Sequence, residues 1–381
     1  MKLFVRFFCI VLVLSLVCTC VYAEGGGIET TAKSVILIDS ATGEVLYEKN
    51  PDERLPIASV TKVMTMLLCM EAINSGKITM EDTVTASEYA CSMGGSQVYL
   101  EPGEQMPVSD MIKAIAVASG NDASVAMAEH IMGSEQGFVA AMNTRAKELG
   151  MENTNFINCN GLDEDGHYSS ARDVAIMSKE LIKHEQILPF LKIWMDTLRN
   201  GEFGLANTNK LIRFYPDAIG IKTGSTGKAK YCVSGAATRN GLTLIAVVLG
   251  AETTTDRFET AKALLNYGFA NYSISEPVKK GEEIANIMVL KGEAESVKVI
   301  TGNGYVKLVP KGADGGYERK VNLPENVTAP VNKGDKAGEI VLLKDGTEVA
   351  KVPLFYAETV PRLSFGEIFV NMLKCWGYNN D

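Results

Sequence analysis

The sequence has few of the residues that build metal and disulfide sites. Its 381 residues include only three histidines and eight cysteines, five of which follow the first 23 residues, and no two cysteines form a C-x-x-C pair. An odd number of irregularly spaced cysteines does not suggest a disulfide framework, and three scattered histidines do not suggest a metal cluster. We therefore expect neither a metal nor a cofactor.

The chain also has no excess of positive charge. Lys and Arg total 37 against 46 Asp and Glu, which gives a formal net charge of −9 at pH 7. Proteins that bind nucleic acid usually carry a basic patch or stripe. The composition therefore predicts no nucleic-acid partner.

Charge is absent from one long stretch, between Phe7 and Ala23. Two cations, Lys2 and Arg6, precede this apolar run and small residues close it, an arrangement typical of a secretory signal peptide. The alternative is an uncleaved transmembrane anchor, but the run is short for a bilayer span, which needs about 20 apolar residues. We expect residues 1–23 to be removed and the mature protein to be exported.

Hydrophobic periodicity predicts an α+β domain over residues 28–271. A strand pair is expected at 34–39 and 44–47, helices at 59–76, 107–148 and 170–184, then strands at 218–221, 231–238 and 242–250 and a helix at 256–266. Asn240-Gly241 is a strong hairpin signal because both turn positions need positive φ. Strands, a block of helices and antiparallel strands in this order predict helices stacked against an antiparallel sheet.

The pattern changes after Asn271. Short β-rich segments separated by Gly, Asp and Lys predict a small all-β domain over residues 276–357 with no catalytic residues of its own.

Ser59-Val60-Thr61-Lys62 is the first of three motifs that can carry chemistry. Residues i and i+3 share a helix face, so the Lys62 amine can approach the Ser59 hydroxyl. An amine can act as base for a hydroxyl when burial or a second cation depresses its pKa. A helix start also brings backbone N–H groups near a developing oxyanion. Two simpler facts count against the motif alone: Ser59 fits an ordinary N-cap, and Ser225-Thr226-Gly227-Lys228 has the same spacing.

The other two motifs are Ser119-Gly120-Asn121, between helical stretches, and Lys222-Thr223-Gly224-Ser225, at the end of an apolar strand. Alone, the first fits an ordinary turn and the second a solvated strand end. Gly224 would let a substrate backbone come close to the strand. Ser-x-x-Lys, Ser-x-Asn and Lys-Thr-Gly in this order and context form the signature of the penicillin-recognising serine enzymes.

Within that group the chain resembles the low-molecular-mass penicillin-binding proteins that are D-alanyl-D-alanine carboxypeptidases, and their sporulation-associated Gram-positive members look especially similar. The resemblance covers nearly everything after the signal peptide and rests on residues 55–65, 118–123, 161–163, 167–173 and 220–224. It implies a β-lactamase/transpeptidase-like domain that removes the terminal D-Ala from peptidoglycan peptides ending in D-Ala-D-Ala. It also implies acylation by β-lactam antibiotics, and action at the extracellular face of the cytoplasmic membrane, in the cell-wall space.

The resemblance assigns a role to each motif. Ser59 would be the acylated nucleophile and Lys62 its base, while Ser119 would relay a proton and Asn121 would hold the substrate amide. The strand residues Lys222, Thr223, Gly224 and Ser225 would bind substrate, with the N–H groups of Ser59 and Ser225 forming the oxyanion hole.

Two positions of this site leave alternatives open. Arg257 matches a family arginine linked to carboxylate recognition, or it is a surface arginine at a helix start. The residue after Lys-Thr-Gly is often His or Phe in the family and is Ser225 here, which puts side-chain contacts to the substrate in doubt. Residues 161–173 predict a turn and a capped helix that also forms one wall of the cleft.

Two other functions compete with this assignment. A class A β-lactamase would need a deacylating glutamate, usually in a Glu-x-x-Leu-Asn segment, which the sequence does not contain, and it would not carry the trailing β domain. A penicillin-binding sensor would be acylated without turnover. Release of D-Ala from a diacyl-Lys-D-Ala-D-Ala peptide distinguishes the three.

The last 20 residues, 362–381, predict an amphipathic helix that opens with the capping box Ser364-Phe365-Gly366-Glu367. An apolar stripe follows at Phe365, Ile368, Phe369, Met372, Leu373 and Trp376. The stripe either packs on the β domain or, as the family resemblance implies, binds a membrane surface. Since Glu367 and Asp381 offset Arg362 and Lys374, any membrane association should be weak.

Overall fold

The computed structural model describes residues 27–313 and 315–377, so the predicted signal peptide lies outside the described residues. The first part of the chain is built on a five-stranded antiparallel sheet of order β2-β1-β9-β8-β7. Its strands are β1 (Ser34–Asp39), β2 (Val45–Lys49), β7 (Ala218–Thr226), β8 (Lys230–Arg239) and β9 (Leu242–Ala251). Segments from the beginning and from the end of this first part of the chain thus meet in one sheet.

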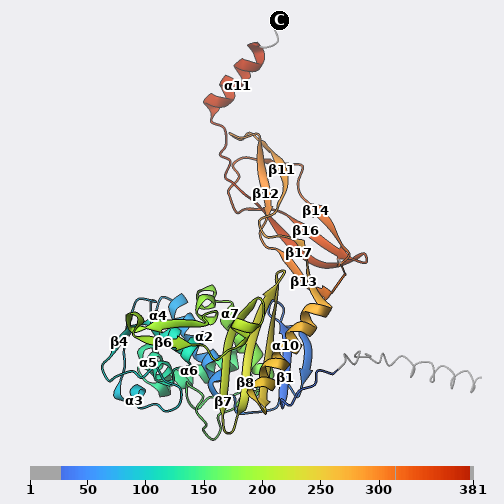
Figure 1. Ribbon diagram of the computed structural model, residues 1–381. Helices are drawn as coiled ribbons and strands as arrows, with labels where there is room; N and C mark the ends of the chain where they lie inside the picture. The colour runs from blue at the N-terminus through green and yellow to red at the C-terminus, as the bar shows by residue number, and fades with distance from the viewer. Residues whose placement is uncertain (1–26, 314, 378–381) are drawn as a thin grey trace, which may run out of the picture. The chain divides into compact units, whose positions relative to one another are not determined.

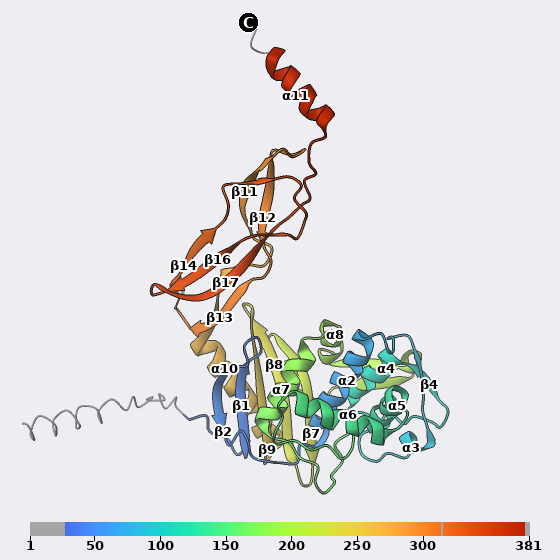
Figure 2. The same cartoon turned by 180° about the vertical axis from the view of Figure 1, so that it is seen from behind.

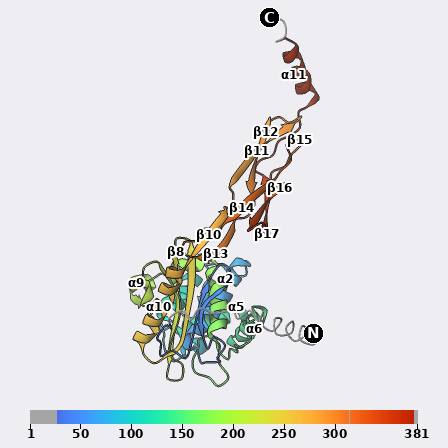
Figure 3. The ribbon, with the colours of Figure 1, turned by 90° about the vertical axis from the view of Figure 1, so that its right-hand side faces the viewer.

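Helices cover both faces of this sheet (Figures 1, 2 and 3). α10 (Thr254–Asn271) packs on one face, against β8 and β9, while α7 (Ala171–Ile182) packs on the other, against β9 and β1. Because both faces are covered, residues 244–251 of β9 are all buried. A strand in this position has a continuous apolar sequence rather than an alternating one.

The helical block lies between β2 and β7 in the sequence. Its elements are η1 (Ala58–Thr61), α2 (Lys62–Asn74), α3 (Glu88–Cys91), α4 (Val108–Lys113), η2 (Ala114–Ala118), α5 (Asn121–Met132), α6 (Glu135–Glu148), α7, η3 (Glu185–Ile187), α8 (Leu188–Leu191), η4 (Arg199–Gly201) and α9 (Leu211–Phe214). Two small sheets join it, β3 (Thr83–Thr85) with β4 (Gln105–Pro107) and β5 (Met195–Leu198) with β6 (Phe203–Ala206). Residues 62–70 of α2 are all buried, as expected of a helix enclosed on every side.

The turn and cap signals of the sequence are confirmed. Asn240 and Gly241 have φ of 50° and 79°, and they connect β8 to β9. The Ser170 hydroxyl accepts a hydrogen bond from the Asp173 N–H at 3.2 Å and so caps α7. The α+β arrangement of helices on an antiparallel sheet is therefore the one predicted.

The second part of the chain is all β. A six-stranded sheet has the order β14-β16-β17-β12-β11-β15, and β10 pairs with β13 separately. The strands are β10 (Tyr272–Val278), β11 (Glu283–Leu290), β12 (Ser296–Thr301), β13 (Tyr305–Pro310), β14 (Tyr317–Asn322), β15 (Asn326–Thr328), β16 (Lys336–Lys344) and β17 (Thr347–Tyr356). Its buried side chains, which include Val299, Ile340 and Leu354, form a core separate from that of the first part.

α11 (Phe365–Gly377) ends the described chain. The predicted capping box is formed: the Ser364 N–H and hydroxyl both donate to Glu367 Oε2, at 2.7 and 2.6 Å. Phe365 is 84 % exposed and Phe369 55 % exposed. The Leu373 and Trp376 side chains of the predicted stripe lie outside the described residues. Within residues 27–313 and 315–377, no helix has both the length and the apolar character needed to cross a membrane.

Candidate active site

Ser59 lies in η1, a 3-10 turn that continues directly into α2. The alternative that Ser59 is an N-cap is wrong, because Ser59 lies within the turn and Ile57 occupies the cap position. The predicted helix start at residue 59 is also slightly early, since the α-helix begins at Lys62. Ser59 is partly exposed, whereas its neighbours Ala58 and Val60 are buried, so the nucleophile candidate faces the surface of a packed turn.

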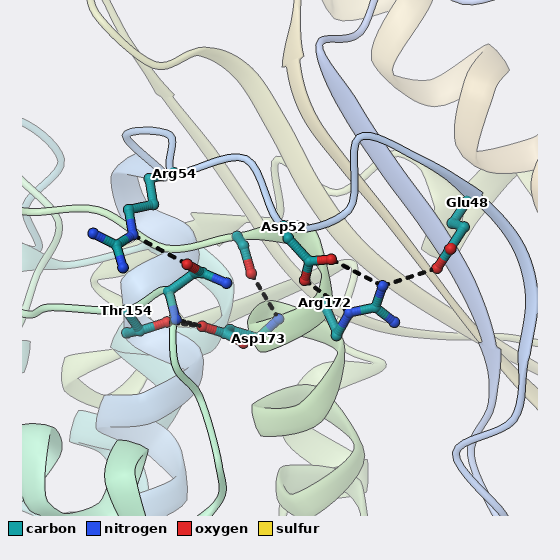
Figure 4. Close-up of polar contacts among 8 residues, drawn as sticks. Glu48, Asp52, Arg54, Thr154, Arg172 and Asp173 are labelled. Atoms are coloured by element: carbon teal, nitrogen blue, oxygen red, sulfur yellow. Dashed lines mark hydrogen bonds and ion pairs between the residues drawn. The ribbon is translucent and has the colours of Figure 1, made fainter.

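The segment that leads into η1 is fixed by polar contacts to the start of α7 and to the loop between α6 and α7 (Figure 4). Arg172 donates to Asp52 at 2.8 Å and to Glu48 at 3.1 Å, and Arg54 donates to Asn153 at 3.1 Å. These contacts hold the chain on both sides of the turn that precedes Ser59. Residues 167–173, which carry part of the family resemblance, therefore support the Ser59 turn.

The Lys62 amine has three oxygen neighbours. Its Nζ lies 3.0 Å from Ser59 Oγ, 2.6 Å from Asn121 Oδ1 and 2.6 Å from the Asn160 carbonyl oxygen. A neutral amine has two N–H groups and one lone pair. The two N–H groups can donate to Asn121 and Asn160, which leaves the lone pair for the Ser59 hydroxyl proton. The contacts fit a charged lysine that donates to all three oxygens, and equally a neutral lysine whose lone pair faces the Ser59 hydroxyl and can act as a base.

Burial and neighbouring cations favour that neutral form. Burial lowers the pKa of Lys62 well below its usual value, and the Lys222 charge lowers it further. Burial also lowers the pKa of Lys222 to about 7, with a contribution from Arg257. Lys62 and Lys222 are 0 % and 2 % exposed, and neither makes an ion pair with a described carboxylate. Burial of a charged group without a partner costs free energy, which a ligand of opposite charge would recover.

Ser119 and Asn121 flank the point where the helical block is interrupted. The π-helical turn η2 ends at Ala118, its C-cap Ser119 has a φ of 61°, in the left-handed region, and α5 then begins at Asn121. This backbone directs the Asn121 side chain to Lys62 on one side and to the Gly94 carbonyl, at 2.6 Å, on the other. The Ser119 hydroxyl is buried without a hydrogen-bond partner among the described residues. It is therefore free to bond to a ligand or to relay a proton.

The Lys-Thr-Gly motif lies on the edge strand β7, directly against η1. A Cβ atom at Gly224 would lie 2.7 Å from the Ile57 carbonyl oxygen and 2.8 Å from the Ser59 nitrogen. The sequence predicted a glycine that admits a substrate backbone, whereas the close neighbour of Gly224 is the backbone of the Ser59 turn. Gly224 thus lets the strand lie beside the nucleophile. Ser225, which follows it, is exposed.

The other two strand residues point to different partners. Lys222 Nζ lies 3.1 Å from the Thr223 carbonyl oxygen, and the Thr223 hydroxyl lies 2.6 Å from that of Thr208. Thr208 belongs to the chain between β6 and α9. The structure therefore adds Thr208 to the environment of the motif.

Arg257 is not a surface residue. It is 5 % exposed, and its Nη1 donates to the carbonyl oxygens of Gly224 and Cys232 at 3.3 and 3.2 Å. Its Nε is buried without a partner among the described residues, and burial lowers its pKa to about 10. The surface alternative is therefore wrong, and Arg257 adds a buried positive charge beside the Lys-Thr-Gly strand.

Two groups near Lys62 are not predicted from the sequence. The Asn160 carbonyl accepts from Lys62, although these residues are 98 positions apart. Asp122 is buried and accepts backbone N–H bonds from Val98 and Leu100, which holds the 94–100 segment beside Asn121. The only sequence signal was Gly161, whose φ of 86° and close approach to the Ala58 carbonyl oxygen bring the 157–162 segment against η1.

Comparisons with known proteins agree with this arrangement. Residues 21–253 match the family described as D-alanyl-D-alanine carboxypeptidase, and residues 272–362 match the C-terminal domain of penicillin-binding protein 5. The D-alanyl-D-alanine carboxypeptidase DacF of Bacillus subtilis is 47 % identical over 91 % of this chain and 90 % of its own length.

Solved structures extend the similarity to three dimensions. Penicillin-binding protein 5 of Haemophilus influenzae superimposes with a TM-score of 0.68 at 34 % identity, over 88 % of this chain and 98 % of that one. Penicillin-binding protein D2 of Listeria monocytogenes, solved in an ampicillin-bound form, gives a TM-score of 0.56 at 31 % identity over 64 % of this chain and 99 % of that one. The resemblance seen in the sequence is thereby confirmed.

Proposed function

The chain belongs to the D-alanyl-D-alanine carboxypeptidase family of serine peptidases, and on this basis we propose that Ser59 is its acylated nucleophile and Lys62 the base. The enzyme is a serine-type D-Ala-D-Ala carboxypeptidase and a penicillin-binding protein of peptidoglycan metabolism. The observation that carries the residue assignment is the Lys62 Nζ, buried near a second lysine and 3.0 Å from Ser59 Oγ.

Ser59 Oγ attacks the carbonyl carbon of the penultimate D-Ala, and its proton passes to Lys62 Nζ. The tetrahedral oxyanion is stabilised by the backbone N–H groups of Ser59 and Ser225. Collapse of this intermediate breaks the peptide bond, and the leaving amine takes a proton from Lys62 or through Ser119. A water molecule then attacks the acyl-enzyme by the same path, which releases the shortened peptide and restores Ser59. The close packing of Gly224 against the Ser59 nitrogen supports this placement of the two N–H groups.

Lys222 and Arg257 recognise the free carboxylate of the terminal D-Ala. Both are buried cations without a carboxylate partner among the described residues, and the Arg257 Nε has no acceptor there. Asn121 orients both the substrate amide and the Lys62 amine. Thr223 and Ser225 line the strand along which the peptide binds. The substrates are peptidoglycan peptides ending in D-Ala-D-Ala, and β-lactams occupy the same site because they too carry a carboxylate beside a reactive carbonyl.

Intact-mass analysis after penicillin treatment, with mapping of the modified peptide, tests this assignment. We expect one adduct, on the peptide that contains Ser59, and none in Ser59→Ala, which should also release no D-Ala from diacyl-Lys-D-Ala-D-Ala. Ser225→Ala is the matched control, because it keeps the backbone N–H and should still be acylated. An adduct on Ser225 would overturn the assignment.

The domain boundaries we propose are a signal peptide at 1–23, a catalytic domain at 28–271, a β domain at 276–357 and a terminal helix at 362–381. The family matches over 21–253 and 272–362 support this division, as do the two separate cores. The mature enzyme acts at the extracellular face of the cytoplasmic membrane, in agreement with its membership of a family that acts on the cell wall.

The terminal helix binds the membrane surface weakly. The exposure of Phe365 and Phe369 supports binding over packing on the β domain. Deletion of residues 362–381 should abolish co-sedimentation with anionic vesicles and leave D-Ala release intact. A Phe365→Ser/Phe369→Ser double variant keeps the helix and should give the same loss. Unfolding of the β domain on deletion, or no co-sedimentation of the intact mature protein, would contradict this prediction.

A further inference from the structure

The segment 157–162 supplies the Asn160 carbonyl that lies 2.6 Å from Lys62 Nζ. This acceptor belongs to a loop between α6 and α7, whereas Lys62 is the first residue of α2 and directly follows η1. The orientation of the lysine amine therefore depends on how firmly the loop is held against η1. Hydrogen bonds to the backbone at either end of the segment determine how firmly the loop is held.

His167 links the two elements through both ring nitrogens. Its Nδ1 lies 3.1 Å from the Ile157 nitrogen, and its Nε2 lies 2.8 Å from Thr61 Oγ1. The Ile157 N–H can only donate, so Nδ1 must be the unprotonated nitrogen and Nε2 must carry the proton. Nε2–H then donates to the Thr61 hydroxyl. Both bonds together require the neutral ring with its proton on Nε2.

The surroundings of the ring favour this form. His167 is 6 % exposed and lies edge-to-face against Phe156, with ring centroids 5.8 Å apart. Burial lowers the pKa of His167 to about 4, and Asp163 is the one charged group that acts on it appreciably, in the opposite direction. The ring is therefore neutral at pH 7, and it can keep accepting from Ile157.

We propose that His167 is a positioning residue for the acylation step, which holds the Asn160 carbonyl against the Lys62 amine by anchoring Ile157 to the Ser59 turn. This inference rests on the proposed roles of Ser59 and Lys62. Thr61 directly precedes Lys62, and Ile157 is three residues before Asn160, so the bridge is short on both sides. His167 itself does not touch the substrate.

Two other contacts limit the size of the effect. The Thr65 hydroxyl donates to the Cys159 carbonyl at 2.5 Å, and the Cys159 N–H donates to Glu135 at 3.0 Å. These bonds hold the middle of the segment even without His167. A displacement of 1 Å at a catalytic group can cost about 100-fold in rate. Because the segment stays partly held, we expect a loss on the order of tenfold.

Three substitutions separate positioning from a purely structural role. His167→Asn places an amide oxygen near the Nδ1 position, so it can still accept from Ile157 but loses the bond to Thr61. His167→Gln reaches the Nε2 position, so it can still donate to Thr61 but loses the bond from Ile157. His167→Leu removes both bonds. His184→Asn is the matched control, because His184 lies at the far end of α7 and bonds to Asn74. The measurements are the rate constant of penicillin acylation and the melting temperature of the mature protein.

We expect His167→Asn, His167→Gln and His167→Leu each to lose on the order of tenfold in the acylation rate, because each breaks the bridge between Ile157 and Thr61 at one end or at both. His167→Asn and His167→Gln each keep one bond and should melt at similar temperatures. His184→Asn should acylate at the parental rate. If His167→Leu does not fold, His167→Asn and His167→Gln still decide. The proposal is overturned if either of these two variants acylates at the parental rate, whatever its melting temperature. A parent that forms no adduct at Ser59 would instead refute the proposed function.

Discussion

The two parts of the chain bury different kinds of side chain. Between β1 and α10 the buried residues include Lys62, Lys222, Arg257 and Asp122, whereas among the described residues from β10 onward the one buried polar residue is Thr301. Burying a charge costs free energy unless hydrogen bonds or an opposite charge compensate. The buried cations of the first part are those to which we assign the chemistry, which is a reason for the fold to bear this cost. The second part has an apolar core and no comparable group.

Lys62→Arg should have the largest effect on the first part. A guanidinium stays protonated at every accessible pH, so it cannot take the Ser59 proton. We expect acylation by penicillin to fall by at least about 100-fold, the usual scale of general base catalysis. Stopped-flow or quenched mass measurements give the rate. An arginine variant that acylates near the parental rate would show that Lys62 is not the base.

Arg257→Ala should have the next largest effect, and only on substrates that carry a carboxylate. A hydrogen bond to a charged group contributes about 1.5–3 kcal/mol, so cleavage of D-Ala-D-Ala peptides should fall by about 10–100-fold in kcat/KM. A small activated ester without the carboxylate should acylate Ser59 almost as before. Equal losses on both substrates would instead indicate that Arg257 only supports the strand through Gly224 and Cys232.

The charge of Lys222 should make the KM for carboxylate substrates depend on pH, an effect smaller than that of Arg257→Ala. With its pKa lowered to about 7 by burial, Lys222 is charged below pH 7 and loses its charge as the pH rises through that value. The affinity for carboxylate substrates should therefore decline above pH 7, by up to about tenfold per pH unit. Lys222→Arg, which stays charged, should remove this limb from the pH profile of KM. A parental KM that is flat from pH 6 to 9 would contradict the assignment.

Leu342→Ala in β16 should have no effect on acylation. Leu342 is fully buried in the core of the second part, so its truncation should lower stability by about 2–5 kcal/mol. Thermal melting would register the loss, while the rate of adduct formation at Ser59, measured well below the melting temperature, should be unchanged. An acylation rate that falls together with stability would show that the two parts are energetically coupled.

Local signals in the sequence predicted the elements well. Asn240-Gly241 predicted the β8–β9 hairpin because both positions require positive φ, and Ser170 predicted the start of α7 because its hydroxyl can cap the N–H of Asp173. The start of α2 was predicted three residues early, because a 3-10 turn at 58–61 and an α-helix place apolar residues at similar spacing. Such boundaries depend on packing rather than on periodicity.

The candidate site was predicted only as far as single motifs allow. Ser59 and Lys62 are three residues apart, so helical geometry alone brings them together. The contact of Lys62 with Asn121 depends on the unusual backbone at Ser119, which no propensity of serine predicts, since non-glycine residues seldom adopt positive φ. Arg257 was ambiguous because its burial arises only when β7 and β8 fold around it, and the local sequence does not indicate that.

The enzyme class follows from the amino-acid sequence alone, because the order and context of three short motifs are specific to one group of serine enzymes. The neutral form and the orientation of the proposed base, Lys62, depend instead on how the chain folds. Folding brings Lys222 and Arg257, which come from an edge strand and a distant helix, into the same buried region as Lys62, and it brings the Asn160 carbonyl to the amine across 98 residues. The pKa of Lys62 depends on that burial and those charges, and both arise from chain segments that meet only after folding.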